Sequence, residues 1–267
     1  MKWKWGQSVG IELSKINLNS VNLNPSVQLN NNRQKVNFLG LQNQDTFQNN
    51  SVQKRYSEAE VRTLINKNPE IKRILDAYKL PLNINISELN NLIETHSKDV
   101  SDNAVAIAKN LPASLKANVN LKNLKDAAIL HDFGKVLIPV EILNKTTSLT
   151  GKEREIINLH SELGYQLLKN TGLNNETLNL VRHHHDNKSP DKSYIPDINL
   201  QILNLADKYS ALTEERVYKG KFTPQQALTI LYKEVQSGEI HPFIFNALVK
   251  TVSEQIPERN IKNCNIG

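Results

Sequence analysis

The chain has 267 residues, of which 39% are hydrophobic and 22% are charged, as is typical of a soluble protein with room for one domain and additional segments. It contains no run of about 18 apolar residues, so we expect no helix that spans a membrane. No apolar core follows the first six residues, which argues against a secretory signal. The single cysteine, Cys264, excludes an internal disulfide, and we therefore expect a cytoplasmic protein.

The net charge of +6 is compatible with an anionic partner such as a nucleotide. Lysine is abundant along the whole chain, so the charge alone says little about function. We expect no nucleic-acid partner.

Residues 1–55 differ from the rest of the chain because asparagine and glutamine dominate them. Their apolar residues follow no sustained period of 2 or 3.6, so the segment cannot bury enough apolar surface to offset the entropy cost of ordering. The composition predicts a disordered tail. Trp3 and Trp5 leave open a docking motif for a protein partner, although incidental occurrence explains them more simply.

From residue 56 onward, apolar residues recur with helical spacing. Ser57 and Glu60 have the spacing of a capping box, and Pro69 is typical of a first helical turn, so two short helices are expected there. A longer helix is expected over 87–111. Further helices are predicted over 124–131, 150–167, 178–185, 202–215, 224–236 and 242–252.

No strand-like alternation appears after residue 55, so the predicted fold class is all-α. We divide the chain into a disordered tail over 1–55, a helical lead-in over 56–90, a catalytic domain over 91–255 and a C-terminal tail over 256–267.

The seven histidines are unevenly distributed, since all except His241 lie between residues 96 and 185. Neutral imidazole is the commonest metal ligand in proteins, and carboxylates complete such sites. A lone histidine on an apolar helix face is usually a core residue. Six in one stretch instead favour a metal site.

Two acids strengthen this interpretation. Asp132 comes after the apolar stretch Ala127–Leu130, and Asp207 lies one turn after Leu203 and one turn before Ala211, so both acids are expected on buried faces. A buried carboxylate is costly unless it is paired or bound to a metal. An ion pair with Lys135 or Arg182 is the simpler explanation for either acid alone. For the adjacent pair His131-Asp132 we prefer the metal.

Adjacent residues on a helix point about 100° apart. His131 and Asp132 can therefore share one metal, while the second oxygen of Asp132 reaches another metal about 3.5–4 Å away. His184 and His185 can serve the second metal in the same way.

Several motifs in succession resemble the HD-GYP subgroup of the HD phosphohydrolases, and the resemblance extends roughly over 96–231. The segments that carry it are Ala127–Pro139, Ile142–Lys145, Leu149-Thr150, His160–Gly164, His183–Asp186, Ile202–Thr213 and Arg216–Tyr218.

The resemblance implies an all-α HD-domain bundle with two divalent transition metals, iron or manganese, and an activity toward cyclic di-GMP. The residues that match the ligands of one metal are His96, His131, Asp132 and Asp207. Those that match the ligands of the other are Asp132, His160, His184 and His185. A register that uses His183 and His184 is the alternative. Lys135, Arg216 and Lys219 match basic residues that contact the substrate phosphates.

Three departures from the family pattern stand out. The Gly-Tyr-Pro loop that names the subgroup is missing, because Asn187–Tyr194 replaces it, and this leaves specificity for cyclic di-GMP open. Leu92 occupies the position of a glutamate found in trinuclear members, so we expect no third metal unless Glu94 substitutes. Ser210 replaces the second acid of the usual Asp-x-Tyr-Asp segment.

We therefore predict a metal-dependent phosphohydrolase that acts on a nucleotide phosphoester, with cyclic di-GMP as the leading candidate. Asp132 holds the metals that activate water, and Lys135 stabilises charge on the phosphoryl oxygens. Ordinary solvated charges remain an open interpretation of Arg216 and Lys219. The alternative function is a weak or inactive signalling module that binds a nucleotide or a protein partner. A third option is an enzyme with a different phosphate ester as substrate.

Overall fold

The computed structural model describes residues 55–186, 197–214 and 221–255, and these residues form helices without a single strand. The predicted all-α fold class is confirmed. The helices are α1 (Glu58–Asn66), α2 (Pro69–Ala77), α3 (Ile86–Glu94), α4 (His96–Asn110), α5 (Ala113–Lys116), α6 (Leu121–Leu130), the 3-10 helix η3 (Phe133–Leu137), α7 (Val140–Leu143), α8 (Gly151–Leu168), α9 (Asn175–His183), α10 (Ile198–Thr213), α11 (Pro224–Gln236) and α12 (Pro242–Gln255).

None of the described helices is long and apolar enough to cross a membrane. The predicted tails over 1–55 and 256–267 fall outside the described residues, apart from Arg55. The predicted boundary between a lead-in and a domain near residue 90 stays a prediction.

Capping boxes begin three of the helices. At α1, the Ser57 hydroxyl accepts from the backbone of Glu60 while the Glu60 carboxylate accepts from the backbone of Ser57, as the sequence predicted. Thr150 and Glu153 form the same reciprocal pair at α8. These caps satisfy backbone N–H groups that would lack partners in the first turn. The start of α8 matters for function because this helix carries His160.

The single helix expected over 87–111 is divided into α3 and α4. Thr95 separates them with a non-helical backbone (φ −112°, ψ −92°). Its hydroxyl and its N–H both bond to the carbonyl of Asn91, which closes the last turn of α3. The apolar spacing continues across the break, so periodicity could not reveal it. The break makes His96 the first residue of α4.

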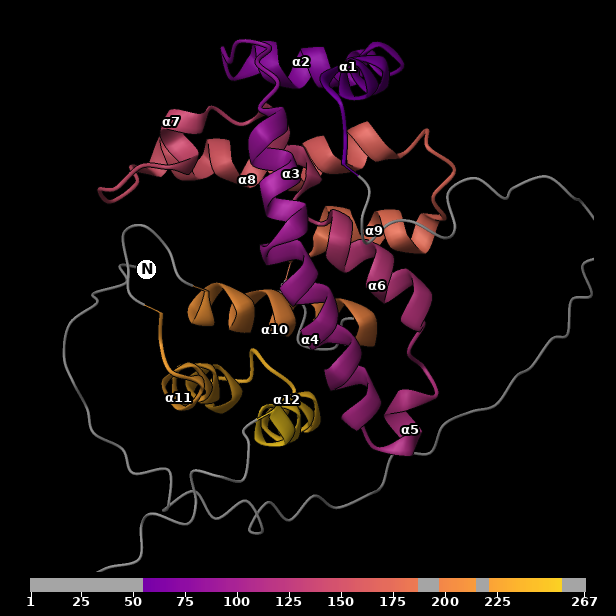
Figure 1. Cartoon of the computed structure of the whole chain (residues 1–267), viewed down its shortest axis with the longest axis vertical. Coiled ribbons are helices and arrows are strands. Elements are labelled where there is room, and N and C mark those ends of the chain that lie inside the picture. The colour runs from indigo at the N-terminus through magenta and orange to yellow at the C-terminus, as the bar shows by residue number, and fades with distance from the viewer. Residues whose placement is uncertain (1–54, 187–196, 215–220, 256–267) are drawn as a thin grey trace, which may run out of the picture. The chain divides into compact units, whose positions relative to one another are not determined.

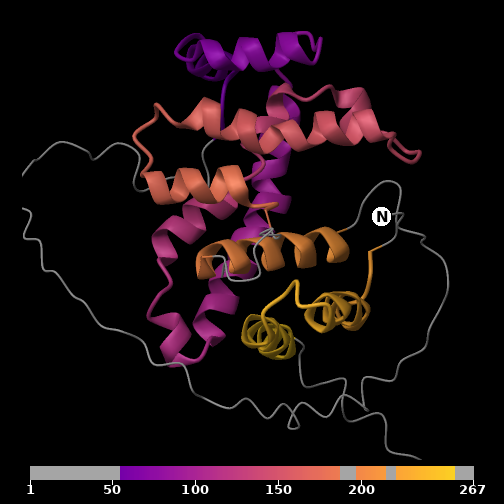
Figure 2. The same cartoon turned by 180° about the vertical axis from the view of Figure 1, so that it is seen from behind.

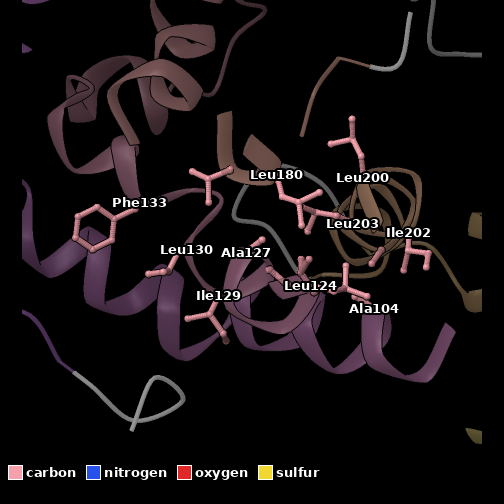
Figure 3. Packing of buried hydrophobic residues seen from close by; sticks show 14 of the residues in the cluster. Ala104, Leu124, Ala127, Ile129, Leu130, Phe133, Leu180, Leu200, Ile202 and Leu203 are labelled. Carbon is pink, nitrogen blue, oxygen red and sulfur yellow. The ribbon is translucent and has the colours of Figure 1, made fainter. Parts of the chain in front are cut away.

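Helix α4 is the central element, and it packs against α3, α6, α10 and α12 (Figures 1 and 2). Fully buried side chains fill the space between α4, α6 and α10, among them Ala104, Leu124, Ala127 and Leu203 (Figure 3). The two alanines leave room for close helix approach, because interiors are packed as densely as organic crystals. This core holds α4, the end of α6 and α10 in one arrangement, and each of these helices contributes a polar residue to the same interior cluster.

Candidate metal centre

The pair His131-Asp132 lies in the turn that joins α6 to η3. Both side chains are buried, and His131 is completely inaccessible. The distance between His131 Nε2 and Asp132 Oδ2 is 3.4 Å. The two residues therefore face a common point, as the sequence predicted for a shared metal.

Gly134 brings this turn against α8. A Cβ atom added to Gly134 would lie 2.0 Å from the His160 carbonyl oxygen and 2.5 Å from the Gly164 nitrogen. Only glycine permits so close an approach between the backbone of η3 and that of α8. The approach places His160 Nε2 within 3.3 Å of Asp132 Oδ1.

The end of α9 supplies two further imidazoles. His160 Nε2 lies 3.1 Å from His184 Nε2 and 3.2 Å from His185 Nε2. His183 points elsewhere, since its Nδ1 pairs with the Asp186 carboxylate at 2.6 Å. The geometry thus favours His184 and His185 over the alternative register with His183.

The first residue of α4 and the middle of α10 complete the cluster. His96 Nε2 lies 3.1 Å from Asp207 Oδ1 and 3.8 Å from Asp132 Oδ2. His131 Nε2 lies 3.8 Å from the same Asp207 oxygen. All seven predicted ligands thus lie in one connected cluster, with His185 at its exposed edge, although metal ligation by them stays a prediction.

Three overlapping groups of these residues have potential ligand atoms within 4.8 Å of one another. They are His96 with His131 and Asp207, His131 with Asp132 and His184, and His160 with His184 and His185. Asp132 lies between the outer groups, with Oδ2 toward His96 and His131 and Oδ1 toward His160.

The donor set fits a divalent transition metal. His131 Nε2 is buried and has no hydrogen-bond partner among the described residues, as expected of a nitrogen whose partner is a cation. Several imidazoles with two carboxylates are ligands that iron, manganese or zinc accept. The residues present could therefore hold such a metal.

Burial lowers the pKa of two of these histidines and so favours the neutral imidazole that binds a metal. Burial lowers the pKa of His160 to about 4, even though Asp132 opposes the shift, and it lowers the pKa of His184 well below its usual range. His96 behaves differently. Burial lowers its pKa, but the carboxylates of Asp207 and Glu214 outweigh this and raise the pKa to about 9.

Lys135 contacts the central acid directly, with Nζ 2.6 Å from Asp132 Oδ2. Burial raises the pKa of the Asp132 carboxyl, but Lys135 and the neighbouring histidines outweigh it and hold the pKa well below its usual range. The ion pair with Lys135 that the sequence analysis gave as the simpler explanation for Asp132 is therefore present. Arg182 pairs instead with Glu162 and lies over the ring of Tyr165, away from both acids.

The remaining predicted residues divide into two sets. Arg216, Lys219 and the segment Asn187–Tyr194 lie outside the described residues. Glu94 pairs with Arg55 at 3.3 Å, is half exposed and belongs to none of the groups whose ligand atoms converge, and the absence of a third metal stays a prediction. Ser210 accepts a hydrogen bond from Asn103 and ties α10 to α4.

Two residues near the cluster escaped the sequence analysis. The Asn204 amide donates to the His184 carbonyl, and Glu214 Oε2 lies 3.4 Å from His96 Nδ1. Asn204 lies in the Ile202–Thr213 motif and Glu214 directly follows it, but each contact joins this motif to a different segment of the chain. No local pattern could therefore have revealed them.

The fold and the site together define a class: a helical protein with a cluster of histidines and aspartates. Residues 93–212 match the family model described as HD domain. This stretch of the chain, which includes all seven predicted ligands, is therefore similar to HD domains.

Curated proteins that are similar in sequence include two cyclic di-GMP phosphodiesterases and one phosphodiesterase named for 3'3'-cGAMP. The "Cyclic di-GMP phosphodiesterase response regulator RpfG" of Xanthomonas campestris is 34% identical over 119 residues, which cover 40% of this chain and 31% of that protein. The "3'3'-cGAMP-specific phosphodiesterase 1" of Vibrio cholerae is 27% identical over 163 residues, 58% of this chain and 37% of that protein. A cyclic di-GMP phosphodiesterase of Pseudomonas aeruginosa is 29% identical over 166 residues, 59% and 38% respectively. The chain spans about a third of the length of these relatives.

Proposed function

We propose that this protein is a phosphodiesterase that hydrolyses a cyclic dinucleotide with the aid of two divalent metals. The observation that carries the proposal is the position of Asp132, whose two carboxylate oxygens face different sets of imidazoles. A carboxylate between two ligand sets is the arrangement that a two-metal site requires. His96, His131 and Asp207 would hold one metal, and His160, His184 and His185 the other.

Bound divalent metals would supply a hydroxide near neutral pH by lowering the pKa of water. The residues of the chain itself would orient the substrate and neutralise charge on its phosphate group. The Lys135 side chain is 22% exposed beside the cluster, so its ammonium can meet a phosphoryl oxygen of an entering substrate. Charge building on that oxygen during attack would be stabilised by this ammonium in a site of low dielectric. Arg216 and Lys219 are proposed to hold further phosphate oxygens.

Cyclic di-GMP is the first substrate to test, because two of the three relatives described above are named for it. The third is named for 3'3'-cGAMP, and this chain carries Asn187–Tyr194 in place of the Gly-Tyr-Pro loop. A panel of cyclic di-GMP, 3'3'-cGAMP and their linear dinucleotides therefore tests both the reaction and the base preference.

The decisive experiment compares the wild type with Asp132→Ala after anaerobic purification, by metal analysis and by hydrolysis of that panel. The wild type is expected to bind two metals and to turn over at least one cyclic dinucleotide. Asp132→Ala is expected to lose metal and activity. Asp102→Ala is the matched control, since Asp102 is an exposed acid of α4 that forms an ion pair with Lys98.

Wild-type protein without transition metal and without metal-stimulated phosphodiesterase activity would refute the proposal. Nucleotide binding without turnover by the metal-loaded wild type would instead establish the signalling module as the function. Turnover of a different phosphate ester would keep the reaction and change the substrate.

A further inference from the structure

Three of the clustered histidines are oriented in the same way. The Nδ1 atoms of His131, His160 and His184 lie 2.8, 2.6 and 2.7 Å from the carbonyl oxygens of Ala128, Ile157 and Val181. Each carbonyl belongs to the residue three positions earlier. A carbonyl can only accept, so Nδ1 carries the proton and Nε2 presents its lone pair to the cluster. The backbone of the helix thereby selects the tautomer that a metal ligand needs.

His96 lacks this arrangement. It is the first residue of α4, directly after the break at Thr95, and its Nδ1 is buried without a hydrogen bond to the described residues. The charged group beside that nitrogen is the carboxylate of Glu214, with Oε2 3.4 Å away. The other ring nitrogen, Nε2, faces Asp207 and the cluster.

Glu214 and Asp207 reach this one ring from the same helix. Glu214 caps the C-terminus of α10, seven residues after Asp207, and seven residues are close to two helical turns. The two acids therefore share a face of α10, and they address the two nitrogens of His96 separately. Glu214 belongs to none of the groups whose atoms converge for a metal, so its place is behind the ligand.

We propose that Glu214 is a positioning residue that accepts a hydrogen bond from Nδ1–H of His96 and so performs for this ligand what backbone carbonyls perform for His131, His160 and His184. The inference rests on the proposed metal site. A shift of a few tenths of an ångström brings the 3.4 Å contact to hydrogen-bond length. Such outer partners orient a ligating imidazole, and their loss typically weakens metal binding about 10–100-fold.

The test compares the wild type with Glu214→Ala and Glu214→Gln in titrations of the metal-free protein with Mn²⁺. Glu214→Ala is expected to weaken one of the two sites about 10–100-fold and to leave the site of His160, His184 and His185 unchanged. Glu214→Gln keeps an acceptor oxygen, so it is expected to restore most of the affinity. Glu155→Ala, which removes an exposed acid of α8, is the matched control.

A second readout requires no metal. In ¹⁵N NMR spectra of the metal-free protein, the Nδ1 proton of His96 is expected to be protected from exchange in the wild type and in Glu214→Gln, and to exchange rapidly in Glu214→Ala. Equal Mn²⁺ affinities together with equal protection in the wild type and Glu214→Ala would overturn the inference. A wild type that binds two metals but hydrolyses nothing would refute the proposed function and leave Glu214 in its role. If the wild type binds no metal, the inference is tested by the exchange of the His96 Nδ1 proton alone, compared between the wild type and Glu214→Ala.

Discussion

The side-chain amide of Asn204 donates a hydrogen bond of 2.8 Å to the backbone carbonyl of His184. Both residues are buried, and Asn204 precedes Asp207 by about one helical turn. The bond ties the end of α9, which supplies two of the clustered imidazoles, to the helix that supplies the second acid. The relative position of these predicted ligands therefore depends in part on a side chain outside the predicted set.

Replacement of Asn204 by alanine should leave the buried His184 carbonyl without this partner. The expected cost is about 1–3 kcal/mol in the free energy of unfolding, measured by chemical denaturation of the metal-free protein. Metal affinity should fall by at least about tenfold in the same variant. Asn179→Ala, which alters an exposed asparagine of α9, should change neither quantity. Wild-type stability in Asn204→Ala would show that the bond contributes nothing.

The adjacent histidines at the end of α9 provide an internal control. His185→Ala removes an imidazole that lies 3.2 Å from His160, so it should weaken one metal site at least about tenfold. His183→Ala removes an imidazole directed at Asp186 and should leave metal content unchanged. Metal analysis of both variants checks the prediction. Loss of metal in His183→Ala alone would reinstate the other register.

Gly134→Ala tests the contact between η3 and α8. The added methyl group would overlap the His160 carbonyl, and neither backbone can yield without moving a ligand. We expect a loss of about 3 kcal/mol in the free energy of unfolding, at the upper end for overpacking, together with loss of metal. Gly151→Ala meets no atom within 4 Å and should stay within about 0.5 kcal/mol of the wild type. Similar melting temperatures for the two variants would contradict the prediction.

Lys135→Met should separate metal binding from catalysis. The ammonium beside Asp132 is expected to act on the transition state, so kcat for the cyclic dinucleotide should fall about 10²–10³-fold while bound metal stays at the wild-type level. Steady-state hydrolysis by the metal-loaded variant measures the change. Lys152→Met, an exposed lysine of α8, is the control. A kcat within twofold of the wild type would assign Lys135 a purely structural role.

Acid stability should depend on the cap of α8. Ion pairing with Lys145, with help from the hydrogen bonds of the Thr150 cap, lowers the pKa of Glu153 from 4.5 to about 2. Because the folded-state pKa is depressed, the stabilisation is fully present above pH 4.5 and is lost as the pH falls through about 2. Glu153→Gln should therefore be less stable than the wild type at pH 6, and the difference should shrink toward pH 2. Denaturation of both proteins across this range gives the answer, and a pH-independent difference would exclude the mechanism.

Local features of the fold could be predicted from the sequence because their causes are local. The capping boxes of Ser57 and Thr150 depend on residues three positions apart, and helical periodicity depends on neighbouring turns. The break at Thr95 escaped prediction because apolar spacing continues through it. The four-residue helices α5 and α7 are too short to produce a periodic pattern.

The order of histidine and aspartate motifs was enough to nominate the ligands and the superfamily, since residue type decides which side chains can bind a transition metal. The sequence could not show which of the three consecutive histidines face the cluster. This depends on where α9 ends and on the hydrogen bond between Asn204 and the His184 carbonyl. The pairing of Glu214 with His96 likewise joins residues more than a hundred positions apart, and it arises from the packing of α10 against α4. Sequence periodicity records which face of a helix is buried, whereas the partner that this face meets depends on how whole helices pack.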